Sequence, residues 1–197
     1  MSGGNLLHWL YGPQTVVEIR ALKTLHLNPA NEGRPFSFGP CSTSLTDLDI
    51  VYSNRMTPPV SLGSLVALRR VTIRVEAQWS LDQVSFSLNT LPSQTIEYLE
   101  VGLRLTHVMD FRIIQLLTSL DRRLFTRKHE WENLKALRVV GYMSEGEWEK
   151  VEERKGFGGF KDCLRSVFNP LLKGHGSVKS VLNVDVVKEG QYVRGGR

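Results

Sequence analysis

The sequence predicts an α/β solenoid: a curved parallel sheet of about six strands with helices and loops on its convex side. Two observations predict this fold. The pattern apolar-x-x-apolar-x-apolar recurs along the chain, and amphipathic helical segments separate its later copies. The last two apolar positions of each copy alternate with polar ones, as in a strand with one buried face. So short a unit cannot bury its apolar side alone, so the copies must stack on one another. An ordinary layered α/β fold is the alternative.

The repeated pattern, called the phrase below, occurs six times, and the last copy is the weakest. The copies are Leu22-Lys-Thr-Leu25-His-Leu27, Leu45-Thr-Asp-Leu48-Asp-Ile50, Leu68-Arg-Arg-Val71-Thr-Ile73, Ile96-Glu-Tyr-Leu99-Glu-Val101, Leu134-Lys-Ala-Leu137-Arg-Val139 and Val181-Leu-Asn-Val184-Asp-Val186. Their starts are 23, 23, 28, 38 and 47 residues apart. Parallel strands need long return connections, so we expect compact turns between the first three strands and helices between the later ones.

Three segments after the fourth phrase are expected to be helical. Residues 111–125 place leucine and isoleucine side chains on one side. Residues 160–168 carry an apolar stripe at i, i+3, i+4, i+7 and i+8, and Pro170 should end that helix. A shorter helix is expected over residues 145–154. Residues 29–40 contain prolines at both ends and are expected to form a loop.

Composition excludes several classes of protein. The chain has 197 residues, of which 41% are hydrophobic and 23% charged, so it can form a core without metal or disulfide support. Its longest uninterrupted apolar run, Leu65 to Leu68, is too short to cross a membrane. The first residues contain no charged segment leading into an apolar stretch. We therefore expect an intracellular protein, cytoplasmic or nuclear, with no membrane partner.

The sequence carries no pattern that supports catalysis, a cofactor or a metal. Gly156-Phe-Gly-Gly-Phe lacks the Gly-Lys-Ser/Thr ending of a phosphate-binding loop. His107 and Asp110 have no third ligand at a suitable spacing. Cys163 lies on an apolar helical stripe, as a packing residue would, and Cys41 is 122 residues away from it. We therefore expect a non-enzymatic protein without cofactor, metal or catalytic residues.

The formal net charge is +5, and the basic residues gather in two places. One is the C-terminal segment 188–197, and the other is a patch formed by Arg122, Arg123, Arg127 and Lys128. The alternative function is therefore a basic module that binds nucleic acid or another anion through these residues. Charges elsewhere are mixed in sign, so we favour a solvated convex surface and do not expect a nucleic-acid partner.

Longer segments around the phrases carry a family resemblance. The segments are Leu91-Pro-Ser-Gln-Thr-Ile-Glu-Tyr-Leu-Glu-Val, Leu120-Asp-Arg-Arg-Leu and Trp131-Glu-Asn-Leu-Lys-Ala-Leu-Arg-Val. Together they resemble the C-terminal leucine-rich region of F-box-like proteins from mushroom-forming fungi. The resemblance implies a short, irregular leucine-rich-repeat solenoid that binds another protein, and a role in substrate recognition for an SCF-type ubiquitin ligase.

Two departures from that family matter. Residues 1–21 are too few for an F-box, the module that joins such proteins to the ligase, and the asparagine expected eight positions after the first leucine of each repeat is absent. We expect residues 1–21 to be an N-terminal cap or the remnant of a preceding segment. Residues 22–187 should form the leucine-rich-repeat-like domain, and residues 188–197 a disordered basic tail. Without a cap, the first strand would associate with another chain through its edge.

The polar positions between the buried ones should form two columns on the concave side of the sheet. One column contains His26, Asp49, Thr72, Glu100, Arg138 and Asp185, and the other begins Thr24, Asp47, Arg70, Tyr98. Opposite charges should meet on neighbouring strands, about 4.8 Å apart. The expected pairs are His26–Asp49, Asp47–Arg70, Glu100–Arg138 and Arg138–Asp185. The candidate partner-binding residues are therefore His26, Asp47, Asp49, Arg70, Thr72, Tyr98, Glu100, Arg138 and Asp185, with an incidental solvated face as the alternative.

Overall fold

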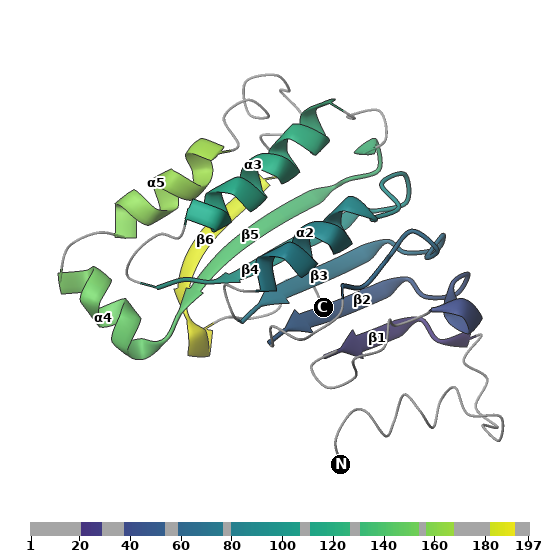
Figure 1. Ribbon diagram of the computed structural model, residues 1–197, viewed down its shortest axis with the longest axis horizontal. Helices are drawn as coiled ribbons and strands as arrows, with labels where there is room; N and C mark the ends of the chain where they lie inside the picture. The colour runs from purple at the N-terminus through teal and green to yellow at the C-terminus, as the bar shows by residue number, and fades with distance from the viewer. Residues whose placement is uncertain are drawn as a thin grey trace, which may run out of the picture.

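The computed structural model describes residues 21–28, 38–53, 59–76, 80–106, 111–126, 131–153, 157–167 and 182–191. In these residues a six-stranded parallel sheet is combined with four α-helices (Figure 1). The strands are β1 (Thr24–Leu27), β2 (Asp47–Tyr52), β3 (Arg70–Val75), β4 (Tyr98–Arg104), β5 (Ala136–Met143) and β6 (Leu182–Lys188). The helices are α2 (Leu81–Asn89), α3 (Phe111–Thr126), α4 (Glu145–Glu153) and α5 (Phe157–Val167), with 3-10 turns η2 (Gly39–Cys41) and η6 (Glu189–Gln191). The expected α/β class is confirmed.

The strands lie side by side in chain order, from β1 to β6. Sheets that bind nucleotides in doubly wound folds do so at a point where the strand order reverses. The described strands contain no such reversal, so they do not offer that kind of crevice. An unreversed parallel order is what stacked repeats would produce.

The phrases pair position by position across the first five strands. Leu25, Leu48, Val71, Leu99 and Leu137 form one row of register partners. The residue after each of them belongs to the next row, which runs from His26 to Arg138 as the sequence predicts.

The predicted register of β6 is wrong by two residues. Arg138 pairs with Asn183, and Asp185 pairs with Val140 instead. Leu182, Val184 and Val186 alternate with Asn183 and Asp185 in the first five residues of β6, and side chains in a strand repeat with period two. A shift of two residues therefore keeps every apolar side chain on the same face, so the hydrophobic pattern cannot distinguish the two registers.

Helices α2, α3 and α5 cover one face of the sheet, and α4 follows the end of β5 (Figure 1). The core between this helical layer and the sheet contains the phrase positions. Its fully buried members include Leu45, Ile50, Leu68, Ile73, Ile96, Leu99, Val101 and Val139. Helix α3 contributes Ile113, Leu116, Leu117 and Leu120, and α5 contributes Leu164. Helices α3, α4 and α5 thus occur where the sequence predicts them. No described helix is both long and apolar enough to cross a membrane.

Helix α2 lies between the third and fourth phrases, where no helix is expected from the sequence. Leu81, Val84 and Leu88 face the core with spacings of three and four residues, which is the signal that could have predicted it. A closed ring of hydrogen bonds joins α2 to β2. The backbone N–H of Val60 donates to Oη of Tyr52 (3.3 Å), Tyr52 donates to Oγ of Ser87 (2.6 Å), and Ser87 donates to the carbonyl of Val60 (2.7 Å). Burial raises the pKa of Tyr52, so its hydroxyl stays a donor.

Other expectations concern the ends of the chain. Residues 1–20, which contain the expected N-terminal cap, lie outside the described residues. At the other end β6 continues to Lys188 and η6 follows it, so regular structure extends past the expected domain end at residue 187. Residues 192–197 of the expected tail also lie outside the described part of the chain.

Candidate functional site

The second face of the sheet carries no described α-helix and is called the open face here (Figure 1). Alternate strand residues point to this face, away from the core. All the candidate partner-binding residues except Asp185 lie in its two predicted columns. One column runs His26, Asp49, Thr72, Glu100, Arg138, and the other runs Thr24, Asp47, Arg70, Tyr98, Ala136.

Asp49 is the centre of the first charged cluster on the open face. Nδ1 of His26 hydrogen-bonds to Oδ2 of Asp49 at 3.1 Å, which confirms the predicted pair. A guanidinium nitrogen of Arg74 lies 3.4 Å from the same oxygen. The Asp49 side chain is only 8% exposed, whereas that of His26 is 61% exposed. Sequence analysis missed Arg74, although it shares a strand and a face with Thr72.

Glu100 is the centre of the second cluster and its side chain is fully buried. Tyr98 donates its hydroxyl proton to Oε2 of Glu100 at 2.6 Å, and Arg138 donates to the same oxygen at 3.1 Å. The predicted Glu100–Arg138 pair is therefore confirmed. Burial, and then the hydrogen bond to negative Glu100, raise the pKa of Tyr98 to about 12. The guanidinium of Arg70 lies over the Tyr98 ring, 5.7 Å from its centroid.

Asp47 lies where the sequence predicts it, whereas Asp185 does not. Asp47 and Arg70 are register partners, as predicted, and Oδ2 of Asp47 accepts a hydrogen bond from the hydroxyl of Thr46. Asp185 forms an ion pair with Lys161 of α5 at 3.3 Å. The expected Arg138–Asp185 pair is wrong, because the two-residue shift of β6 moves Asp185 along the strand.

On the strands of the open face, basic side chains are more exposed than acidic ones. Its exposed strand residues include Arg70, Arg104 and the imidazole of His26, and Arg104 forms an ion pair with exposed Glu189 of η6 at 3.6 Å. Its acidic residues, Asp47, Asp49, Glu100 and Asp185, are all half-buried or buried. Asp49 and Glu100 therefore hold the basic and aromatic groups around them in place, namely His26 and Arg74 for Asp49 and Tyr98 and Arg138 for Glu100.

A second set of ordered residues lies at the strand starts. In each of the first four phrases, the residue after the first apolar position accepts two backbone hydrogen bonds from the next strand through its carbonyl oxygen. The acceptors are Lys23, Thr46, Arg69 and Glu97, with N···O distances of 2.8 to 3.2 Å. This ladder explains the spacing of the phrase: a buried apolar residue anchors the turn, and the next residue begins the pairing.

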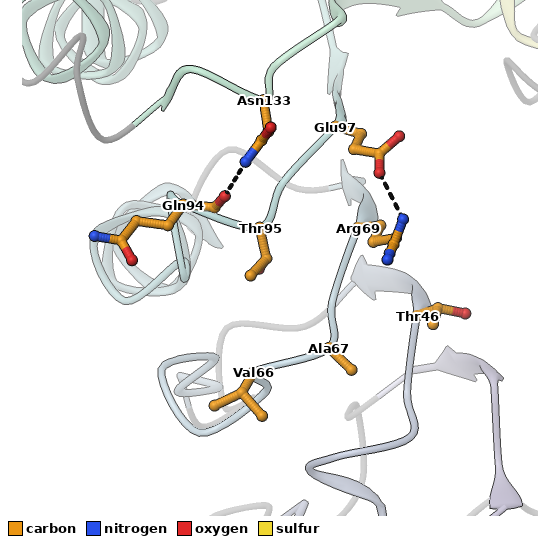
Figure 2. A pocket seen from close by; sticks show the side chains of 8 residues that line it. All are labelled: Thr46, Val66, Ala67, Arg69, Gln94, Thr95, Glu97 and Asn133. Atoms are coloured by element: carbon orange, nitrogen blue, oxygen red, sulfur yellow. Dashed lines mark hydrogen bonds and ion pairs between the residues drawn. The ribbon is translucent and has the colours of Figure 1, made fainter.

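A cavity of about 320 Å³ opens beside this ladder (Figure 2). It is lined by Thr46, Val66, Ala67, Arg69, Gln94, Thr95, Glu97 and Asn133. Nδ2 of Asn133 donates to the carbonyl of Gln94 at 2.6 Å across its upper wall (Figure 2). The carboxylate of Glu97 binds Arg69 at 2.9 Å and Lys135 at 2.6 Å. The hydrogen bond from Lys135, aided by the charge of Arg69, lowers the pKa of Glu97. Sequence analysis did not identify this site.

The basic patch is only partly described. Arg122 is exposed on α3, the side chain of Arg123 lies outside the described residues, and so do Arg127 and Lys128. The residues that the structure describes contain no cluster of potential metal ligands. Cys41 is buried and Cys163 is half-buried on α5.

Comparisons with models of known protein families, with curated proteins and with solved structures give no match. The resemblance to F-box-like leucine-rich regions therefore stays a prediction from the sequence.

Proposed function

We propose that this protein is a non-enzymatic interaction module that binds a partner protein across the open face. The observation that carries the proposal is the ordered polar surface spanning β1 to β5, in which buried Asp49 and Glu100 position the side chains around them. Side chains that are already fixed lose less conformational entropy on binding than free ones. A surface built in this way favours recognition without any chemistry.

The dimensions of the sheet favour a small interface. Six strands at about 4.8 Å and about six residues per strand at about 3.3 Å give a patch of roughly 24 by 20 Å. A standard stable interface buries about 800 Å² on each partner, so this patch alone fits a weak or transient complex. Loops around the sheet would have to contribute for tighter binding.

The resemblance gives the proposal a more specific form. It implies a leucine-rich-repeat solenoid that selects substrates for an SCF-type ubiquitin ligase. The unreversed parallel order and the placement of a phrase at each strand start support the repeat architecture. The ligase role rests on the resemblance alone.

Affinity capture followed by calorimetry tests the proposal. Wild-type chain, an open-face variant (His26→Ala with Arg70→Ala) and a helix-side control (Arg165→Ala) are used as baits in an extract of a mushroom-forming fungus. These positions are exposed. His26→Ala removes one basic partner of Asp49, but Arg74 still binds that carboxylate, and neither substitution replaces a hydrogen-bond partner of Glu100. The partner is then purified and its dissociation constant measured with each variant.

We expect the open-face variant to weaken binding at least about tenfold and the control to leave it unchanged. A ligase subunit among the captured proteins would support the more specific role. Equal binding by all three chains would contradict the proposal. Capture of anionic polymers with a steep salt dependence would favour the basic module of Arg122, Arg123, Arg127, Lys128 and the tail.

A further inference from the structure

Three cations occupy equivalent positions at the strand starts. Lys23, Arg69 and Lys135 directly precede β1, β3 and β5, and all three are exposed. Thr46 and Glu97 occupy the same position before β2 and β4. A cation therefore lies directly before every second strand from β1 to β5. Lys23, Arg69 and Lys135 are together called the strand-start strip below. The strip lies at the ends of the strands and shares no residue with the clusters on the open face.

Glu97 holds two members of the strip in place without neutralising both. Its two carboxylate oxygens bind Arg69 and Lys135 separately, so the three side chains together carry a net charge of +1. A guanidinium has five N–H donors and an ammonium three. One nitrogen of Arg69 is engaged by Glu97, and both cations keep most of their surface in solvent, at 64% and 73% exposure. They can therefore accept a further carboxylate while Glu97 keeps them oriented.

The strand spacing beneath the strip matches an extended peptide. The backbones of alternate strands in a parallel sheet are about 10 Å apart, and three residues of extended chain span about 10 Å. The charged ends of Arg69 and Lys135 lie closer together than their strands, because both bind the carboxylate of Glu97. We propose that the strand-start strip binds an extended acidic segment of another polypeptide, crossing the strands, with acidic residues at every third position. The cavity beside Arg69 would receive a side chain between two of the acids, on a wall formed partly by Val66 and Ala67 (Figure 2).

The same spacing argues against a nucleic acid. A nucleic-acid strand carries a phosphate about every 3.4 Å along its axis, so it would place negative charge against Glu97 as well as against the cations. Single-stranded nucleic acid is also held by stacking on aromatic side chains. The strip and the lining of the cavity contain none. A peptide with an acid at every third residue brings its charges to the cations and passes Glu97 with neutral residues.

Fluorescence anisotropy with two labelled peptides of equal composition tests the inference at low salt. The peptides are Glu-Ser-Ser-Glu-Ser-Ser-Glu and Glu-Glu-Glu-Ser-Ser-Ser-Ser. We expect the spaced peptide to bind about threefold or more tightly than the clustered one. Arg69→Gln with Lys135→Gln should weaken binding of the spaced peptide by about threefold to tenfold, the loss expected for two exposed charge contacts.

Glu97→Gln provides the opposite change at the same site. It removes the negative charge that binds Arg69 and Lys135, so it should strengthen binding of the spaced peptide severalfold. Arg165→Gln on α5 and His26→Ala on the open face are controls that should leave it unchanged. These controls separate binding at the strand-start strip from binding at the open face. If the strip does not bind the peptide, the proposed function of the open face still stands. If the open face does not bind a partner, the inference about the strip still stands.

Three results would overturn the inference: no measurable binding of the spaced peptide, equal affinity for both peptides, or weaker binding by Glu97→Gln. Tighter binding of a single-stranded oligonucleotide of equal charge, lost in the Arg69→Gln and Lys135→Gln variant, would assign the strip to nucleic acid instead. Circular dichroism of each variant confirms that the fold is retained.

Discussion

The two faces of the sheet use the same strands in opposite ways. On the core side, Leu48, Val71 and Leu99 are buried aliphatic residues that could exchange places with little change in chemistry. On the open face, the residues around Asp49 and Glu100 have particular partners, as Glu100 has with Tyr98 and Arg138. Burial of apolar area is non-directional, whereas a buried ion pair requires defined geometry. The core side therefore determines the stability of the fold, and the open face determines which side chains a partner would contact.

Truncating a central core residue should have the largest effect on the free energy of unfolding. Leu99 is fully buried in the middle of the sheet, so Leu99→Ala should cost about 2–5 kcal/mol. Leu25 is partly exposed on edge strand β1, so Leu25→Ala should cost less. Urea denaturation of both variants measures the difference. A cost below about 1 kcal/mol at Leu99 would contradict the placement of the phrase in the core.

Removing the buried carboxylate should have the second largest effect. Glu100→Ala leaves Tyr98 and Arg138 without their shared acceptor, and we expect a loss of about 1–3 kcal/mol. Glu100→Gln keeps an acceptor for both donors and should cost less. The same denaturation experiment tests the order. If both variants were as stable as the wild type, the clusters would not hold the open face in place.

The hydroxyl of Tyr52 is the exception on the core side, because it closes a hydrogen-bonded ring there. Tyr52→Phe removes the donor to Ser87 and the acceptor of the Val60 N–H. We expect a loss of about 1–2 kcal/mol with the fold retained. Ser87→Ala should have a similar effect, and the double variant should cost less than the sum of the two. Additive losses would show that the ring does not act as a unit.

The smallest effect concerns alkaline pH. The pKa of Tyr98 is raised from 10.0 to about 12, so folding favours the neutral phenol. The stabilisation is complete below pH 10 and should be lost as the pH rises from 10 through about 12. Titration of phenolate absorbance in wild type and Tyr98→Phe isolates this group. A difference curve with its midpoint at pH 10 would show that neither burial nor the hydrogen bond to Glu100 perturbs Tyr98.

The contrast between the faces also explains what the sequence could predict. Apolar periodicity placed β1 to β5 in register, and with them the pairs His26–Asp49 and Glu100–Arg138. The period-two repeat of β6 fits two registers equally well, so Asp185 was misplaced. Arg74 and the Arg69–Glu97–Lys135 group were missed because their contacts depend on long, flexible side chains rather than on periodicity. Helix α2 was missed because only Leu81, Val84 and Leu88 mark its buried side.

Hydroxyl-radical footprinting with and without the captured partner tests the central claim most directly, because it needs no substitution. His26 and Tyr98 report on the open face, and exposed Phe86 and Phe111 report on helices α2 and α3. If the open face binds the partner, the oxidation rates of His26 and Tyr98 fall in the complex while those of Phe86 and Phe111 stay the same. Protection of the two phenylalanines with unchanged oxidation of His26 and Tyr98 would place the partner on the helical side and contradict the account.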